Sequence, residues 1–227
     1  MSPSDYRDPV RQMTSVLAAP EKRLLVYIAR RLPAWVNSDH LTVLGGLAML
    51  GAGASYWLSA RYPPALLLVV VFLGINWFGD SLDGTVARVR NCQRPRYGFY
   101  VDHILDTVGA LLIVAGLGLS GYMTPLVAAA VLVAYYLLSI EVFLAASALK
   151  TFQMGFFGFG PTELRILMAI GTVALFDHAT VSIAGHRFLL FDVGGVCAAV
   201  GMTLFFLVSA ARNTRALYRE EPIARAS

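Results

Sequence analysis

Six apolar runs, each long enough or nearly long enough to cross a lipid bilayer, dominate this 227-residue chain. A membrane-spanning helix needs about 20 predominantly apolar residues. Hydrophobic residues make up 57% of the chain and charged residues only 14%, far from the composition of an ordinary soluble domain. We therefore expect an all-α integral membrane protein with six transmembrane helices. Their residue ranges are 41–60, 65–79, 98–120, 124–149, 161–176 and 193–211, and the second helix continues beyond residue 79 into a polar motif.

Lysine and arginine residues give an independent test of this count, because they gather in the cytoplasmic connections of membrane proteins. If the N-terminus is cytoplasmic, every lysine and arginine except Arg61 and Arg187 falls in a cytoplasmic segment. We therefore expect a multi-pass protein of a bacterial inner or plasma membrane with both termini in the cytoplasm. The net charge of +4 then reflects topology and attraction to anionic lipid headgroups, which argues against nucleic-acid binding.

The chain outside the spans divides into short segments. Residues 1–20 are polar, and we expect them to be loosely ordered and not to include a cleaved signal peptide. Residues 21–36 mix leucine and isoleucine with lysine and arginine, which is typical of an amphipathic helix at the membrane interface. A basic flank of the first span is the alternative. We expect a six-helix catalytic domain over 37–212 and a charged cytoplasmic tail over 213–227.

Two local patterns mark the first span and the long loop. Asn37, Ser38 and Asp39 are good helix-starting residues directly before the first span. That span also carries small residues that allow close approach of a neighbouring helix, namely Gly45, Gly46, Gly51 and Gly53. The glycine-rich run 151–160 is predicted to be a loop near the membrane surface.

Four aspartates interrupt the apolar pattern where charge is least favourable. Asp80 and Asp83 follow the second apolar run, and Asp102 and Asp106 lie in the third. A lone aspartate at the centre of a bilayer is unfavourable by roughly 2.5–3.5 kcal/mol on insertion scales. Four within 27 residues therefore need cations to neutralise them, and a divalent metal site explains this pattern best.

Each pair of aspartates belongs to a stripe along one face of a helix. The first stripe consists of Asp80, Asp83, Gly84, Ala87 and Arg88. The second stripe consists of Gly98, Asp102 and Asp106. The small residues leave room for a bulky ligand, and the two stripes can face each other.

The residue types in these stripes indicate the chemistry. Ligands that offer only oxygen favour a hard cation such as Mg²⁺, Mn²⁺ or Ca²⁺ over zinc. Because Mg²⁺ usually completes its coordination with water and substrate phosphates, a substrate with a diphosphate is expected. Arg88 can bind a phosphate oxygen in bidentate fashion. Together these groups indicate phosphoryl transfer, in which positioning and charge stabilisation carry the catalysis.

Two other interpretations of the aspartates remain open. They can be buried hydrogen-bond partners or helix caps. They can also belong to an ion- or proton-coupled transporter, since buried acids mark ion pathways in membranes. The sequence lacks the repeated halves and the pair of broken helices that are usual in transporter folds.

The spacing of the stripe residues resembles the signature of the CDP-alcohol phosphotransferase family, also called CDP-alcohol phosphatidyltransferases. That signature reads D-x2-D-G-x2-A-R and, after a short spacer, G-x3-D-x3-D, and every signature residue is present between Asp80 and Asp106. The resemblance implies an enzyme of phospholipid biosynthesis in which an acceptor hydroxyl attacks the β-phosphate of a CDP-linked alcohol and CMP is released. It also implies a homodimer.

The resemblance further implies a role for each signature residue. Asp80, Asp83 and Asp102 would bind one or two divalent ions, Mg²⁺ or Mn²⁺. Asp106 would complete the metal site and is the candidate catalytic base for the attacking hydroxyl. The residues that would admit and hold the cytidine diphosphate are Gly84, Ala87, Arg88 and Gly98.

Other positions show a partial resemblance to the choline/ethanolamine phosphotransferase branch, which transfers a phospho-alcohol from a CDP-alcohol to diacylglycerol. They are Asp102-His103, Glu141 and Gly160-Pro161-Thr162-Glu163. The larger prokaryotic-type group instead uses CDP-diacylglycerol and a small polar acceptor. Both directions of transfer remain open, and Glu141 and Glu163 join the candidate substrate-binding residues.

Three of the polar residues in the spans have two interpretations each. Glu141 either contributes to a substrate site or polar network or makes a structural hydrogen bond. His103 points about 100° away from Asp102 on a helix, which favours a histidine satisfied by its neighbours over a ligand. Arg165 either contacts a phosphate or extends its charged end to the membrane interface.

Overall fold

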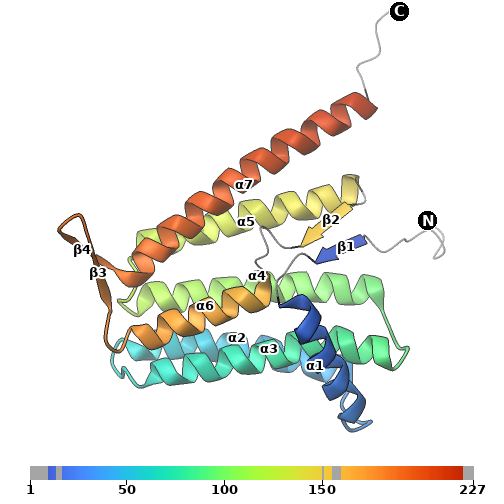
Figure 1. Cartoon of the computed structure of the whole chain (residues 1–227), viewed down its shortest axis with the longest axis horizontal. Helices are drawn as coiled ribbons and strands as arrows, with labels where there is room; N and C mark the ends of the chain where they lie inside the picture. Colours follow the sequence, from blue (N-terminus) through green and yellow to red (C-terminus); the bar gives the residue numbers. More distant parts are fainter. Residues whose placement is uncertain (1–9, 14–16, 150, 155–159, 222–227) are drawn as a thin grey trace, which may run out of the picture.

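The computed structural model describes residues 10–13, 17–149, 151–154 and 160–221. Within them the fold is all-α apart from four short strands (Figure 1). The helices are α1 Ala18–Arg31, α2 Ser38–Ser59, α3 Ala65–Val89, α4 Pro95–Leu119, α5 Pro125–Ala148, α6 Pro161–Ala174 and α7 Leu190–Glu220. The strands are β1 Val10–Met13, β2 Thr151–Met154, β3 Thr180–Ile183 and β4 His186–Leu189.

Five helices of the described chain, α2 to α5 and α7, are long and apolar enough to cross a membrane. The protein is therefore a multi-pass integral membrane protein. The fifth predicted span corresponds to α6, whose 14 residues cover about 21 Å, less than the roughly 30 Å of a hydrocarbon core. Six spans with cytoplasmic termini in a bacterial membrane stay a prediction.

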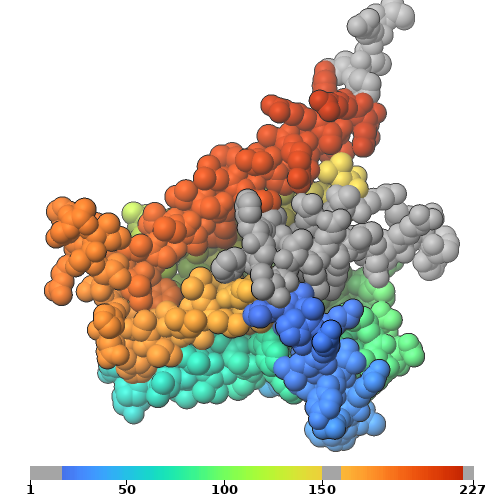
Figure 2. Space-filling model, viewed as in Figure 1, coloured from blue at the N-terminus to red at the C-terminus, as the bar shows by residue number. Residues whose placement is uncertain are grey.

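Helices α2, α3 and α4 pack side by side, and α6 lies against α3 (Figure 1). Helix α5 pairs with α7 on the other side of α4. Helix α1 crosses the end of the bundle where α3 passes into α4, and the β3–β4 hairpin lies at the opposite end. Figure 2 shows α1 packed on that end, while the C-terminal part of α7 stands out from the other helices.

Glycines allow α2 to approach both of its neighbours closely. A Cβ atom added at Gly79 of α3 would lie 2.6 Å from the carbonyl oxygen of Leu41. One added at Gly116 of α4 would overlap the carbonyl oxygen of Gly53. These backbone contacts fix α2 between α3 and α4, as the small residues of the first span predict.

Two apolar clusters lie on either side of a polar region along α2 and α3. One cluster joins α2, α3, α4 and α6 near the hairpin end, with Tyr56 and Leu66 fully buried. The other joins α1 to α2 and α3 through Leu25, Leu41 and Val86. The region between the two clusters contains the aspartates.

Several bounds differ from those expected from the sequence. The helix predicted over 21–36 begins earlier, at Ala18, and ends at Arg31; its location at a membrane interface stays a prediction. Helix α7 continues through Glu220, so the segment predicted as a tail begins as helix. Residues 151–154, predicted as a loop, form β2 in parallel with β1. The rest of the 1–20 and 213–227 segments lies largely outside the described residues.

Candidate active site

The four aspartates of the two predicted stripes line one cavity. Asp80 and Asp83 reach it from α3, and Asp102 and Asp106 reach it from α4. The cavity encloses about 300 Å³, counted together with its opening to solvent. The other lining residues are Thr42, Gly45, Gly46 and Met49 of α2, Asn76 of α3 and Leu105 of α4. The helical spacing of both pairs thus brings four carboxylates to a common space.

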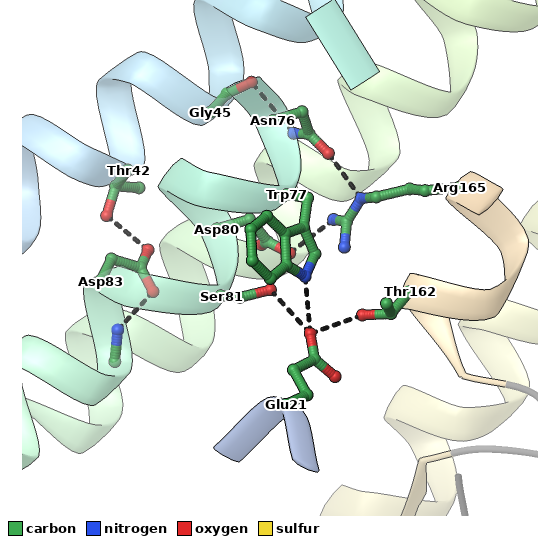
Figure 3. Close-up of polar contacts among 11 residues, drawn as sticks. Glu21, Thr42, Gly45, Asn76, Trp77, Asp80, Ser81, Asp83, Thr162 and Arg165 are labelled. Atoms are coloured by element: carbon green, nitrogen blue, oxygen red, sulfur yellow. Dashed lines mark hydrogen bonds and ion pairs between the residues drawn. The ribbon is translucent and has the colours of Figure 1, made fainter. Parts of the chain in front are cut away.

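Asp83 is buried, and its carboxylate is held on both oxygens. Its Oδ2 accepts a hydrogen bond of 2.7 Å from the Thr42 hydroxyl, and its Oδ1 accepts one from the backbone N–H of Gly84 (Figure 3). A buried carboxylate is costly unless it is hydrogen-bonded. These contacts therefore both stabilise Asp83 and fix the direction of its side chain.

Asp80 forms an ion pair with Arg165, which reaches α3 from α6 (Figure 3). The Nη2 atom of Arg165 lies 2.5 Å from Oδ2 of Asp80, and its Nε donates to Oδ1 of Asn76 at 2.7 Å. The Nδ2 atom of Asn76 in turn donates to the carbonyl oxygen of Gly45 at 3.1 Å. This chain of contacts joins α6, α3 and α2 at the cavity.

Arg165 is one of the three polar residues for which the sequence allowed two interpretations. The structure places it against a cavity carboxylate, at an exposed side-chain fraction of 14%. Its Nη1 is buried, and among the described residues it has no hydrogen-bond partner. In the sequence, Arg165 is recognisable as an arginine one turn inside a predicted span. Its pairing with Asp80, 85 positions away in the chain, could not be predicted because it depends on how α6 packs.

The residues expected to hold cytidine diphosphate lie along the same two helices but do not line the cavity. The guanidinium of Arg88 is exposed and donates to the Thr85 hydroxyl at 2.9 Å. A Cβ atom added at Gly84 would lie 3.2 Å from Nη1 of Arg88, whereas one added at Gly98 would have no atom within 4 Å. Ala87 is buried. The roles of these four residues in nucleotide binding stay predictions.

Glu141, a candidate substrate-binding residue, lies in a polar network between α5 and α7. Its carboxylate is buried and accepts hydrogen bonds from the Ser209 hydroxyl at 2.9 Å and from Nδ2 of Asn213 at 2.7 Å. It does not line the cavity. These contacts agree with the structural alternative considered for Glu141.

Glu163, the other candidate, caps the helix on which it lies. Its carboxylate accepts hydrogen bonds from the backbone N–H of Gly160 at 2.9 Å and of Leu17 at 3.2 Å. The first bond is the glutamate half of a capping box, since Gly160 has no side chain to supply the other half, and the second bond links α6 to the start of α1. A substrate contact by Glu163 stays a prediction.

His103 is also placed by its neighbours. Its Nδ1 lies 2.5 Å from the carbonyl oxygen of Phe99, and its ring packs against Phe99 and Phe143. This agrees with a histidine satisfied within the helix bundle.

The chemistry of the cavity fits a hard divalent cation. Four carboxylates and one threonine hydroxyl offer only oxygen ligands, and Arg165 forms an ion pair with Asp80. Among the described residues, no three acidic, histidine or cysteine side chains are close enough to form a complete ligand set. Arg165 contacts one oxygen of Asp80, and Thr42 and Gly84 each contact one oxygen of Asp83, so both carboxylates keep further lone pairs for a cation. The metal site stays a prediction.

Comparison with known proteins agrees with this arrangement. A family model described as CDP-alcohol phosphatidyltransferase matches residues 35–211. Among solved structures, the chain is similar to phosphatidylinositol phosphate synthase of Mycobacterium tuberculosis with CDP-DAG bound. The sequence identity is 19%, the TM-score is 0.55, and the match covers 90% of this chain and 99% of the other. This likeness shows a shared fold. No curated protein gives a significant match.

Proposed function

This chain belongs to the CDP-alcohol phosphatidyltransferase family, and from that premise we propose the reaction of its carboxylate-lined cavity. The protein transfers a substituted phosphate group from a CDP-linked donor to an alcohol hydroxyl and releases CMP, in phospholipid synthesis. The observation that carries this proposal is the convergence of Asp80, Asp83, Asp102 and Asp106 on one cavity. Membership in a family of transferases, rather than of transporters, accounts for these four acids in membrane helices.

CDP-diacylglycerol is the donor that we favour, with a small polar alcohol as acceptor. The family description names phosphatidyl transfer, and the similar solved synthase has CDP-DAG bound. The residues that suggested the choline/ethanolamine branch have structural contacts instead: His103 with Phe99, Glu141 with Ser209 and Asn213, and Glu163 with Gly160. The opposite direction of transfer therefore has less support.

Divalent cations belong to this proposal, since the family generally depends on them. Asp80, Asp83 and Asp102 would hold one or two ions, Mg²⁺ or Mn²⁺, with Asp106 completing the set. When bound, such an ion neutralises the diphosphate and stabilises the charge that develops on the phosphoryl oxygens.

Side chains of the protein accept the proton and bind the nucleotide. Asp106 is exposed at the cavity, where it accepts the proton of the acceptor hydroxyl. The hydroxyl oxygen forms a bond to the β-phosphorus of the donor, and the bond from that phosphorus to the oxygen of CMP breaks. Arg88, at the end of the first stripe, binds a phosphate oxygen of the nucleotide. Gly84, Ala87 and Gly98 leave room beside it.

A panel of donors and acceptors tests the proposal. The purified protein in lipid is given CDP-diacylglycerol or CDP-choline with glycerol phosphate, serine, inositol phosphate or diacylglycerol, and CMP and lipid product are identified by mass spectrometry. We expect CMP only with CDP-diacylglycerol and one of the polar acceptors. Turnover of CDP-choline with diacylglycerol would reverse the direction, and no CMP from any pair would overturn the function.

The homodimer implied by the family resemblance stays part of this proposal. Apolar side chains on α7 are exposed in the single chain, among them Val200 and Leu204, and either lipid or a second copy can cover them. Light scattering of the detergent-solubilised protein measures the number of chains per particle.

A further inference from the structure

Glu21 of α1 connects the two helices that supply the Asp80–Arg165 pair. Its Oε1 atom accepts hydrogen bonds from Nε1 of Trp77 at 2.7 Å and from the Thr162 hydroxyl at 2.7 Å, with the Ser81 hydroxyl at 3.5 Å (Figure 3). Trp77 and Ser81 lie on α3, and Thr162 lies on α6. One oxygen of Glu21 therefore bridges α3 and α6, in addition to their direct contacts.

In a second contact between the α1 and α6 regions, the acceptor lies on α6 and the donor lies at the start of α1. The carboxylate of Glu163 on α6 accepts from the backbone N–H of Leu17, directly before α1. Thr162 donates to Glu21, and Glu163 accepts from Leu17, so the N-terminal ends of the two helices are joined reciprocally. The first turn of α6 is thus fixed by α1.

The residues held by Glu21 are neighbours of the cavity pair. Ser81 follows Asp80 in the chain, and Thr162 lies three positions before Arg165, which places it on the same side of α6. Glu21 itself does not line the cavity. Its effect on the cavity must therefore pass through the relative position of α3 and α6.

We propose that Glu21 is a positioning residue that aligns Arg165 with Asp80, an assignment that rests on the proposed transferase function. One oxygen of Glu21 accepts hydrogen bonds from both helices, so a single acceptor on a third helix relates the position of α6 to that of α3. Without this oxygen, the first turn of α6 is free to move away from α3, and Arg165 no longer holds the orientation of Asp80.

Two variants separate the hydrogen-bond acceptor from the charge. Glu21→Gln keeps the Oε1 acceptor, whereas Glu21→Ala removes it. Glu220→Ala is the matched control, because Glu220 is an exposed glutamate at the end of α7. We expect kcat for CMP release to fall about tenfold in Glu21→Ala, because the acceptor shared by Trp77 and Thr162 is lost. Glu21→Gln and Glu220→Ala should remain within about twofold of the unmodified protein.

A double-mutant cycle with Arg165→Lys tests whether Glu21 acts through Arg165. If it does, Glu21→Ala lowers kcat less than about twofold in the Arg165→Lys background, because the alignment has already been lost. Equal losses in both backgrounds would mean independent effects and would overturn the proposal.

Amide hydrogen exchange of the full-length protein in lipid needs no turnover. In Glu21→Ala we expect the amides of Leu164, Arg165 and Ile166, the first in α6 with intrahelical acceptors, to exchange at least about tenfold faster, because local opening becomes easier. Glu21→Gln should show no change. Unchanged exchange in Glu21→Ala would overturn the link between α1 and α6, whether or not the protein releases CMP. Absence of CMP release from the unmodified protein would overturn only the transferase function.

Discussion

The Nη2 atom of Arg165 lies 2.5 Å from Oδ2 of Asp80, which joins the short helix α6 to a cavity lined by four carboxylates. Because the same guanidinium also contacts Asn76, both the charge and the planar shape of arginine are used. In the absence of a divalent ion this arginine compensates part of the negative charge of the cavity. The pair therefore links the packing of α6 to the chemistry of the site.

Replacing Arg165 tests this link. Lysine cannot make both contacts with the same geometry, so Arg165→Lys should lower CMP release about tenfold and destabilise the fold by roughly 1–3 kcal/mol. Arg215→Lys, at an exposed position of α7, is the control. Unchanged activity and melting temperature in Arg165→Lys would show that the simultaneous contacts of arginine with Asp80 and Asn76 are not needed.

Asp83→Ala should abolish activity while the protein remains folded. The substitution removes a carboxylate assigned to the metal and leaves the Thr42 hydroxyl with the carbonyl oxygen of Ser38 as its acceptor. We expect CMP release to fall at least about a hundredfold, as when a charge-stabilising group is lost. Binding of Mn²⁺, followed by electron paramagnetic resonance, should weaken in parallel. Full turnover in Asp83→Ala would contradict the assigned mechanism.

Asp106→Asn separates proton transfer from cation binding. Asparagine keeps an oxygen at the cavity but is no base, so transfer should fall about a hundredfold or more. Mn²⁺ binding should change little, because the other three aspartates remain. An active Asp106→Asn enzyme would exclude Asp106 as the base.

Gly79→Ala should disturb the packing of α2 against α3, and through it the cavity that these helices line. The added methyl would lie 2.6 Å from the carbonyl oxygen of Leu41 and 2.7 Å from the backbone nitrogen of Gly45, so the helices must separate. We expect a loss of roughly 1–3 kcal/mol in stability, measured as a lower melting temperature. Gly74→Ala on the same helix has no atom within 4 Å and should be neutral or slightly stabilising. Equal melting temperatures for the two variants would contradict this packing.

The sequence alone predicted the parts of the site that depend on local periodicity. A helix places Asp80 and Asp83 on one face, and apolar length predicts helices over most of α2 to α5 within a few residues. Asn37, Ser38 and Asp39 were expected to start the first span, and Asn37 is the N-cap of α2.

The parts that depend on tertiary packing could not be predicted. The partners of Arg165, Glu141 and Glu21 lie more than 50 positions away in the chain, so no local pattern reveals them. Glu163 had a local signal, because it lies three residues after a helix start, as in a capping box.

The turn of the β3–β4 hairpin contains a glycine that a search for apolar runs does not consider. Ala184 and Gly185 form its turn with φ values of 50° and 84°, which resembles the two-residue turns favoured in hairpins. Only the glycine indicates such a turn in the sequence, since alanine rarely adopts positive φ.

The central claim is that a divalent cation held by the cavity carboxylates is needed for the reaction. The most direct test is whether formation of CMP and of the lipid product depends on that cation. CMP and lipid product are measured from CDP-diacylglycerol and its accepted alcohol, before chelation, after chelation and after Mg²⁺ is restored. We predict equal amounts of the two products, loss of both on chelation and recovery of both with Mg²⁺, with no recovery in Asp83→Ala. Equal turnover in the chelated protein, or in Asp83→Ala, would contradict a carboxylate-held cation at this cavity.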